Sequence, residues 1–203
     1  MGCSLSTEQI AKTIEFHGHE CPGLSIGLRA AELCLRELGH NDQSPLVAVS
    51  ETDMCGADAI QFLTGCTYGK GNFIHRDHGK MAFSFHRRSD GKALRALLRP
   101  DAYGPAGVEM RELMKRIVDG TASEEEKRRS QELRAQVQKA IMDADLEILF
   151  SIEAIESLPP RPARILDSLA CAHCGELTME SRTRRFGGET LCIPCFEQVE
   201  QKI

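Results

Sequence analysis

The sequence predicts an α+β protein in two parts, a core domain over residues 1–158 and a small zinc domain over residues 159–203. Helical patterns occur before and after a group of short strand patterns, without the regular strand–helix alternation of a parallel sheet. This order favours a small, largely antiparallel sheet packed by helices. The proline cluster at 159–162 cannot continue a helix, so we expect a stiff, extended connector where the second domain begins.

Two helices are expected at the start of the chain. Ser6 and Gln9 form a capping box, which opens a short helix that should end near Gly18. A second helix should have Pro22 in its first turn and end before Gly39. Its apolar residues recur with the period of a helix and form one buried stripe: Leu24, Leu28, Ala31, Leu35 and Leu38.

Short apolar runs in the middle of the chain predict strands. Residues 46–50 form one strand and residues 57–63 a short helix. Residues 73–76 and 81–86 should form a pair of strands, since the second alternates apolar and polar residues. A helix is expected over residues 108–118. Ser123 then caps a long charged helix whose apolar positions are Leu133, Val137, Ile141, Leu146 and Leu149.

The composition limits the partners and the compartment. Hydrophobic residues make up 41 % of the 203 residues, but no apolar run approaches the ~20 residues of a membrane span. The net charge of −5 argues against nucleic-acid binding, and acidic residues offset the basic cluster Arg182, Arg184 and Arg185. Nine cysteines without a secretory leader indicate metal or thiol chemistry in the cytoplasm. The residues after Met1 also fit the loose myristoylation pattern, for which a frayed terminus is the simpler interpretation.

The C-terminal cysteines predict a structural zinc site. Cys171 and Cys174 form one CxxC pair, and Cys192 and Cys195 form a second pair after residues 175–191. Each CxxC turn presents two thiolates, and four thiolates make the closed tetrahedral site of a zinc ribbon or a treble clef. A segment of this size has too little apolar surface for a core of its own. Zinc would therefore supply its folding energy.

A second cluster of histidines and cysteines lies near the N-terminus. His17, His19 and Cys21 occupy alternate positions, and Gly18 favours an extended segment that would place all three on one face. Cys21 and Cys55 each precede a predicted helix, whose N-terminal N–H groups should stabilise a thiolate. If the thiols meet, the cluster is a transition-metal or redox site. The alternative is a pair of histidines bound to backbone carbonyls and a small, buried Cys55.

Three other features carry weaker predictions. The glycine-rich loop 65–72 differs from a Walker A loop, so a tight turn is a simpler interpretation than an anion cradle. Asp77, His78 and Lys80 lie in a predicted turn, either beside a cleft or in solvent. Cys34 falls within the apolar helix and should belong to the core.

Four sequence motifs stand out along the first part of the chain: Phe16-His17-Gly18-His19-x-Cys21-Pro22-Gly23, Cys55-Gly56-Ala57-Asp58-Ala59-Ile60-Gln61, Leu63-Thr64-Gly65-Cys66-Thr67-Tyr68-Gly69-Lys70-Gly71-Asn72 and Asp77-x-Gly79-Lys80-Met81-Ala82-Phe83. These motifs resemble those of the FmdE proteins, a family named for the E component of formylmethanofuran dehydrogenase. Together with the four C-terminal cysteines, the resemblance spans nearly the whole chain. The C-terminal cysteines also resemble a DksA/TraR-type zinc finger.

The resemblance to FmdE proteins implies a groove in which zinc or another transition metal is bound by four residues, with Asp58 and Lys80 nearby. The four are His17, His19, Cys21 and Cys55. The resemblance also implies a homodimer and an association with a molybdenum or tungsten oxidoreductase system. The expected function is a metal-binding accessory protein or an oxidoreductase component in which Cys21, Cys55, Asp58 and Lys80 are catalytic. The alternative is a regulatory protein whose finger binds a partner and whose core only dimerises.

Overall fold

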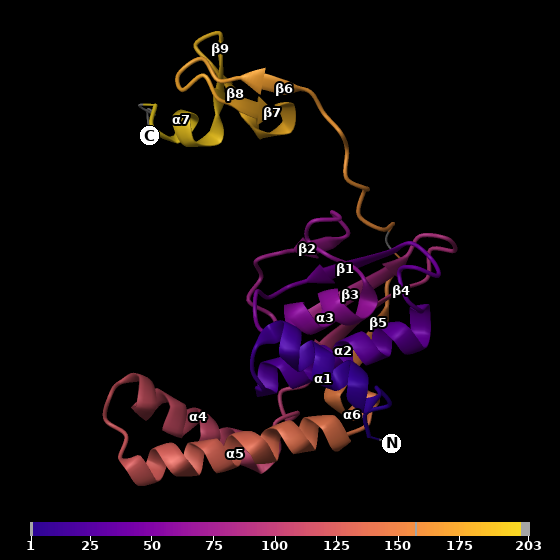
Figure 1. Cartoon of the computed structure of the whole chain (residues 1–203), viewed down its shortest axis with the longest axis vertical. Coiled ribbons are helices and arrows are strands. Elements are labelled where there is room, and N and C mark those ends of the chain that lie inside the picture. The colour runs from indigo at the N-terminus through magenta and orange to yellow at the C-terminus, as the bar shows by residue number, and fades with distance from the viewer. Residues whose placement is uncertain (1, 157, 200–203) are drawn as a thin grey trace. The chain divides into compact units, whose positions relative to one another are not determined.

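The computed structural model describes residues 2–156 and 158–199, and it divides into two compact units (Figure 1). The first unit extends to Pro162 and the second begins at Ala163. A five-stranded sheet packed by helices forms the first unit, and two small hairpins with a short helix form the second. The predicted α+β class is therefore confirmed.

The first two helices lie where the sequence predicts them. Helix α1, Thr7–His17, has the full capping box, and it ends at Gly18 with a left-handed φ of 91°. Helix α2, Pro22–Leu38, begins at Cys21 as its N-cap. Twelve of the helix's residues are buried, including all but Leu35 of its predicted stripe. Helix α2 is thus the central helix of the core.

The sheet has the strand order β2-β1-β3-β4-β5. Its members are β1 Leu46–Ser50, β2 Phe73–His75, β3 Ala82–Arg87, β4 Ala93–Leu98 and β5 Phe150–Ala154. Only the β1–β2 contact is parallel, so the sheet is largely antiparallel as predicted. The predicted direct pairing of residues 73–76 with 81–86 is wrong, because the fully buried β1 lies between them.

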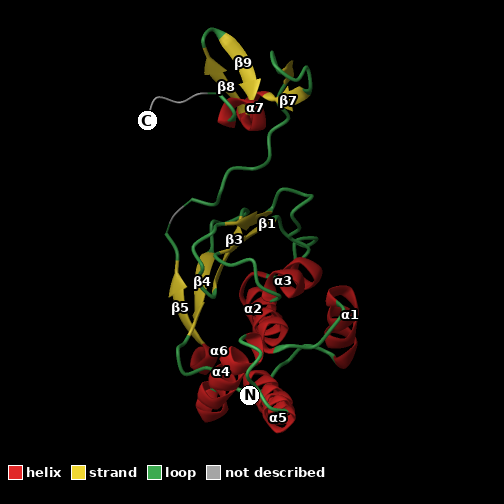
Figure 2. Ribbon diagram, turned by 90° about the vertical axis from the view of Figure 1, so that its left-hand side faces the viewer, coloured by secondary structure: helices red, strands yellow, loops and turns green. Residues whose placement is uncertain are grey.

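Helices cover one face of this sheet. Figure 2 shows α2 and α3, Gly56–Thr64, on the same side of the strands. Alternate strand residues such as Phe83, Phe85 and Leu94 point into this layer and form the main core. Within the described residues, no helix covers the opposite face, to which Ser84, His86 and Arg95 belong. The two faces therefore differ in chemistry.

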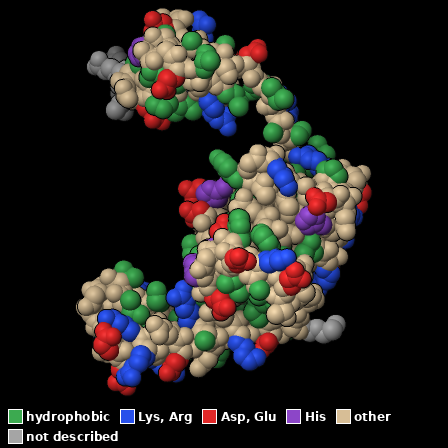
Figure 3. Space-filling view, in the orientation of Figure 1, with side chains coloured by type: hydrophobic (Ala, Val, Ile, Leu, Met, Phe, Trp, Pro, Cys, Tyr) green, Lys and Arg blue, Asp and Glu red, His purple; other side chains and the backbone are tan. Residues whose placement is uncertain are grey.

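A helical hairpin extends from the core. It consists of α4, Gly104–Val118, and α5, Glu124–Asp143, and the capping box at Ser123 is present as predicted. The predicted long helix stops at Asp143, because Ala144 is extended, and α6, Leu146–Leu149, is a separate turn before β5. Acidic and basic side chains intermix on the hairpin in Figure 3, with hydrophobic side chains exposed among them.

The sequence missed strands β4 and β5. Residues 93–98 carry too little alternation to distinguish a strand from a loop, and residues 150–154 directly follow the helical apolar pattern. Both strands are placed by tertiary pairing, β4 against β3 and β5 against β4. The description of 108–118 as one helix is confirmed within the longer α4.

The second unit has little apolar interior. Strands β6, Ser168–Ala170, and β7, Leu177–Met179, form one hairpin, and β8, Thr183–Phe186, pairs with β9, Glu189–Cys192. A 3₁₀ turn, Glu180–Arg182, joins the hairpins, and α7, Ile193–Glu197, follows them. Leu191 is the one buried residue of this unit other than cysteine among those described.

Membrane insertion by a helix finds no support among the described residues, since none of their helices combines the length and the hydropathy of a bilayer span.

Candidate metal centres

The four C-terminal cysteines form one cluster. The sulfurs of Cys171, Cys174, Cys192 and Cys195 all lie within 4.8 Å of one another, as the two CxxC pairs predict. Cys171 is buried, and its Sγ accepts the Cys192 backbone N–H at 3.3 Å. Hydrogen bonds from the Cys174 and Cys192 backbone lower the pKa of Cys171 to about 6. A hydrogen bond to Cys192 raises the pKa of Cys195 to about 12. Four thiolates this close require a divalent cation to offset their charge, and a tetrahedral all-sulfur set is typical of zinc.

The N-terminal histidines and cysteines form a second cluster. Ligand atoms of His17, His19, Cys21 and Cys55 also lie within 4.8 Å of one another. The segment between the histidines is not extended as predicted, because His17 is the last residue of α1 and Gly18 turns the chain with a positive φ. This left-handed turn places the two imidazole rings 4.4 Å apart, centroid to centroid. The two histidines are therefore brought together by a helix end and a turn, and not by the predicted extended segment.

The two thiols differ in their surroundings. Cys21 is 4 % exposed and its Sγ accepts the Leu24 backbone N–H at 3.3 Å, so the predicted helix-cap position is present. Cys55 is the N-cap of α3, but it has an α-helical φ of −46° and its thiol makes no cap hydrogen bond. Burial, with a hydrogen bond to Cys21, raises the pKa of Cys55. Cys55 therefore lacks the thiol contact to its helix that Cys21 makes.

His17 has the environment of a metal ligand. Its Nδ1 lies 2.8 Å from the Asp58 carboxylate, which is in the first turn of α3. Its Nε2 is buried, and none of the described residues forms a hydrogen bond with it. A ring that is oriented by a carboxylate through one nitrogen and free at the other matches the carboxylate–histidine–metal arrangement of known sites. The predicted proximity of Asp58 to the cluster is confirmed by this contact.

Close packing of α2 and α3 brings the thiols together. A Cβ built on Gly27 would lie 2.3 Å from the Cα of Gly56 and 2.4 Å from its carbonyl oxygen. Only glycine permits this approach. Cys21 and Cys55 begin these same two helices, so the backbone contact sets the distance between their side chains. The sequence analysis did not identify Gly27 or Gly56 as contact residues. A usable signal was present, because Gly23 and Gly27 are four residues apart on one helix face, a spacing that indicates a close helix contact.

The remaining predicted residues lie outside the cluster. Lys80 is exposed in the turn before β3, and within the described residues its ammonium makes no hydrogen bond or ion pair. His78 Nδ1 lies 3.3 Å from Glu51, and Asp77 is exposed. Cys34 is fully buried in the core as expected, and burial raises its pKa. Loop 65–72 is a turn in which Lys70 Nζ donates to the Gly65 carbonyl, which agrees with the simpler prediction.

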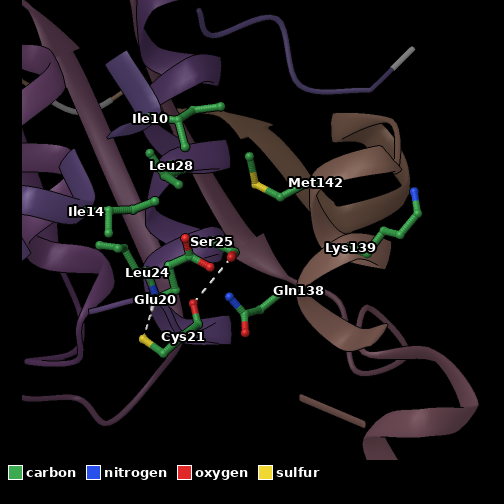
Figure 4. A pocket seen from close by; sticks show the side chains of 10 residues that line it. All are labelled: Ile10, Ile14, Glu20, Cys21, Leu24, Ser25, Leu28, Gln138, Lys139 and Met142. Carbon is green, nitrogen blue, oxygen red and sulfur yellow. Dashed lines mark hydrogen bonds between the residues drawn. The ribbon is translucent and has the colours of Figure 1, made fainter. Parts of the chain in front are cut away.

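A small cavity of about 180 Å³ lies beside α2, between α1 and α5. Apolar side chains such as Ile14, Leu28 and Met142 form its walls, and Gln138 and Lys139 contribute polar groups (Figure 4). Cys21 also borders it, but the figure shows its Sγ directed toward Leu24 N. This cavity is therefore separate from the ligand atoms of the cluster.

Residues 16–151 match the family model described as FmdE, molybdenum formylmethanofuran dehydrogenase operon. The chain belongs to the FmdE family. The resemblance predicted from the motifs is thereby confirmed, and the match contains the whole N-terminal cluster. Residues 164–201 match the model of the prokaryotic DksA/TraR C4-type zinc finger. This FmdE-family chain therefore carries a zinc-finger-type second unit, and its overall type is an FmdE-like accessory protein that binds metal.

Two known proteins extend the comparison. A probable S-adenosyl-L-methionine-binding protein of Archaeoglobus fulgidus is 30 % identical over 199 residues, which cover 93 % of this chain. The chain spans about half the length of that relative, 52 %. The crystal structure of a tungsten formylmethanofuran dehydrogenase FmdE-like protein from Syntrophus aciditrophicus superposes with a TM-score of 0.61 at 24 % identity, covering 95 % of this chain and 93 % of that one. At this identity the likeness shows the fold alone.

Proposed function

We propose that the core of this FmdE-family chain is a metal-binding module that holds a thiophilic divalent cation, zinc in the first instance, between α1, α2 and α3. The observation that carries the proposal is the convergence of four ligand atoms within 4.8 Å, one of them the buried and unpartnered Nε2 of His17. Two thiolates and two imidazoles are a common zinc set.

The charges of the cluster favour a bound cation over a free thiol pair. Burial and the nearby Cys21 raise the pKa of Cys55, so without a cation the two cysteines resist forming thiolates together. Two thiolates would balance a divalent cation. His17 would bind through Nε2, because the Asp58 carboxylate holds Nδ1. The fit of these residues to the metal thus rests on charge and on ligand direction.

Exposure divides the four ligands into a fixed part and a labile part. The side chain of His17 is 9 % exposed and Cys21 is buried, whereas His19 is exposed. A bound zinc ion would supply Lewis-acid chemistry. His19, which is free to leave the cluster toward solvent, would then open one coordination position to a small molecule. We propose this exchange at His19 as the basis of any activity, with Cys21 and Cys55 as fixed ligands.

Metal analysis of the purified protein tests the core site. The natural chain should contain two zinc ions, and the Cys21→Ser/Cys55→Ser variant should contain one. Cys171→Ser/Cys174→Ser should also contain one, which separates the two centres. Cys3→Ser is the matched control, since Cys3 belongs to neither cluster, and it should keep both ions. One zinc per natural chain, unchanged in Cys21→Ser/Cys55→Ser, would rule out the core site.

A regulatory role is the second candidate, and the match of residues 164–201 to the DksA/TraR finger supports it. In this role the finger binds a protein partner and the core serves for dimerisation. The exposed Arg182, Arg184 and Arg185 would provide a basic contact surface. Replacing all three with alanine should then abolish partner binding without loss of finger zinc. Tight, salt-dependent binding to duplex DNA would instead identify nucleic acid as the partner.

Two partner proposals follow from family membership. We propose that the chain forms a homodimer and works with a molybdenum or tungsten enzyme system. The family model is named for the formylmethanofuran dehydrogenase operon, which supports the second proposal. Exposed apolar residues of α4, Val108, Met114 and Val118, offer a surface for the first. Light scattering after size exclusion would measure the mass in solution, and a monomer at every concentration would exclude the dimer.

A further inference from the structure

The face of the sheet opposite to α2 and α3 contains a cavity of about 320 Å³ that the proposed metal chemistry does not use. Ser84, His86 and Arg95 lie on its floor, where Ser84 pairs in register with Val49 on one side and with Arg95 on the other. Ile155 and Pro160, which follow β5, form part of its wall. Arg88 Nη2 donates to the Pro160 carbonyl at 2.7 Å, which fixes this wall to the end of β3.

Several polar groups in this cavity lack partners. His86 is 5 % exposed, and its Nδ1 is buried with no hydrogen bond to any residue that the structure describes. Ser84 as a residue is 7 % exposed, and neither its hydroxyl nor the exposed Arg76 guanidinium has a hydrogen-bond partner among the described residues. A buried polar group without a partner destabilises the fold, so the His86 Nδ1 in a native cavity requires an explanation.

The charge of the cavity is positive. Arg95 binds both oxygens of Glu51, at 2.6 and 3.0 Å, so this pair contributes no net charge. Arg76 makes no ion pair among the described residues, and Arg88 adds a second positive charge close by. Glu153, which pairs in register with Arg95, contributes one carboxylate against these two cations, so the surroundings keep a net positive charge. Burial, together with Arg76 and Arg88, lowers the pKa of His86. The imidazole is therefore neutral near pH 7, and its Nδ1–H tautomer is a hydrogen-bond donor.

We propose that this cavity is a binding site for a small organic anion, whose carboxylate or phosphate oxygens are bound by Arg76, His86 and Ser84. The guanidinium supplies the charge, and the imidazole and the hydroxyl supply neutral donors inside the cavity. Val49 and Ile155 accommodate an apolar part of the ligand. The cavity is large enough for a ligand of several heavy atoms. Neither the core cluster nor the zinc finger contributes a residue to this site.

Titration of the full-length, zinc-loaded protein tests the proposal. Inorganic phosphate and acetate are the probes, each compared with sodium chloride at equal ionic strength, and the His86 imidazole resonances are followed by NMR after assignment with His86→Gln. We expect saturable shifts with at least one oxyanion and none with chloride. Saturation by acetate alone identifies a carboxylate ligand, and saturation by phosphate alone identifies a phosphate ligand.

Variants decide whether the cavity is responsible. Arg76→Ala should weaken the binding about tenfold, since it removes a charged hydrogen bond, and Ser84→Ala should weaken it several-fold. Arg76 is exposed, so its replacement should leave the fold intact. Arg128→Ala is the matched control, an exposed arginine on α5 outside the cavity, and it should bind as the natural chain does. No saturable shift at His86, or equal weakening by Arg76→Ala and Arg128→Ala, would overturn the proposal.

Discussion

Gly27→Ala is the substitution that most directly tests how the fold builds the core cluster. The new Cβ would lie 2.3 Å from the Cα of Gly56. This is more than 1 Å inside the usual carbon–carbon contact of roughly 3.5–4.0 Å. Both atoms belong to backbone, so relief requires that α2 and α3 move apart by about 1 Å.

The energetic cost can be worked out from this geometry. Overpacking of a core typically costs about 1–3 kcal/mol, and a clash between backbones belongs at the upper end. Alanine gains about 1 kcal/mol over glycine within a helix. The net destabilisation should be about 2 kcal/mol, which lowers the melting temperature of a protein of this size by about 4–8 °C. Zinc at the core site should also be lost to a chelator faster, because Cys21 and Cys55 separate with their helices.

Gly23→Ala is the matched control on the same helix. A Cβ there would meet Cys55 Cβ at 3.4 Å and Cys21 Sγ at 3.8 Å, which are ordinary contacts. Differential scanning calorimetry and release of zinc to a colorimetric chelator measure the two effects. A melting temperature for Gly27→Ala equal to that of Gly23→Ala, with equal zinc release, would refute the account of helix packing.

Three further variants test other parts of the first unit. Arg29→Met should lower the free energy of unfolding, measured by chemical denaturation, by about 3–5 kcal/mol, because it leaves the buried Glu32 without its ion pair and the Met142 and Ala144 carbonyls without their donor. The double variant Arg29→Met/Glu32→Gln should recover part of this loss. No recovery would contradict an effect of the Glu32 charge. Ser123→Ala should cost about 1 kcal/mol and speed amide exchange in the first turn of α5, whereas Ser123→Asp should retain the cap. Arg95 lowers the pKa of Glu51 from 4.5 to about 2, so the Glu51–Arg95 ion pair stabilises the fold above pH 4.5, and this stabilisation is lost as the pH falls toward 2. Glu51→Gln should therefore flatten this part of the pH–stability curve. An unchanged slope would show that the ion pair is not coupled to folding.

Local patterns predicted much of the fold. The capping boxes at Ser6 and Ser123 and the proline in the first turn of α2 depend on neighbouring residues alone, and the structure has all three. The position of β1 between β2 and β3 depends on contacts that distant residues make, and no local pattern encodes it. The end of α5 is a similar case. The apolar pattern continues to Leu149 and predicts a helix of that length, but α5 ends at Asp143. Arg29, from across the core, binds the carbonyls of Met142 and Ala144 at this helix end.

The core cluster was predicted in its members but not in its geometry. Spacing alone suggested that His17, His19 and Cys21 belong together, yet the proposed extended segment is a helix end followed by a left-handed glycine. Whether Cys55 lies beside them depends on the backbone contact between Gly27 and Gly56. No side-chain pattern in the sequence predicts this contact. The partner of His17, Asp58, lies 41 residues away and entered only through the family motif.

The difference between the two centres bears on their roles. In the second unit the cysteines lie in two CxxC turns, and little apolar surface besides Leu191 is buried, so the fold there depends on the metal. In the first unit a large apolar core with Phe83, Phe85 and Phe150 stabilises the fold by itself. The first unit therefore does not need a metal at the core cluster in order to fold, and the four ligand residues are not required for its stability. On this reasoning, removal of all metal should unfold the second unit while the first keeps its sheet.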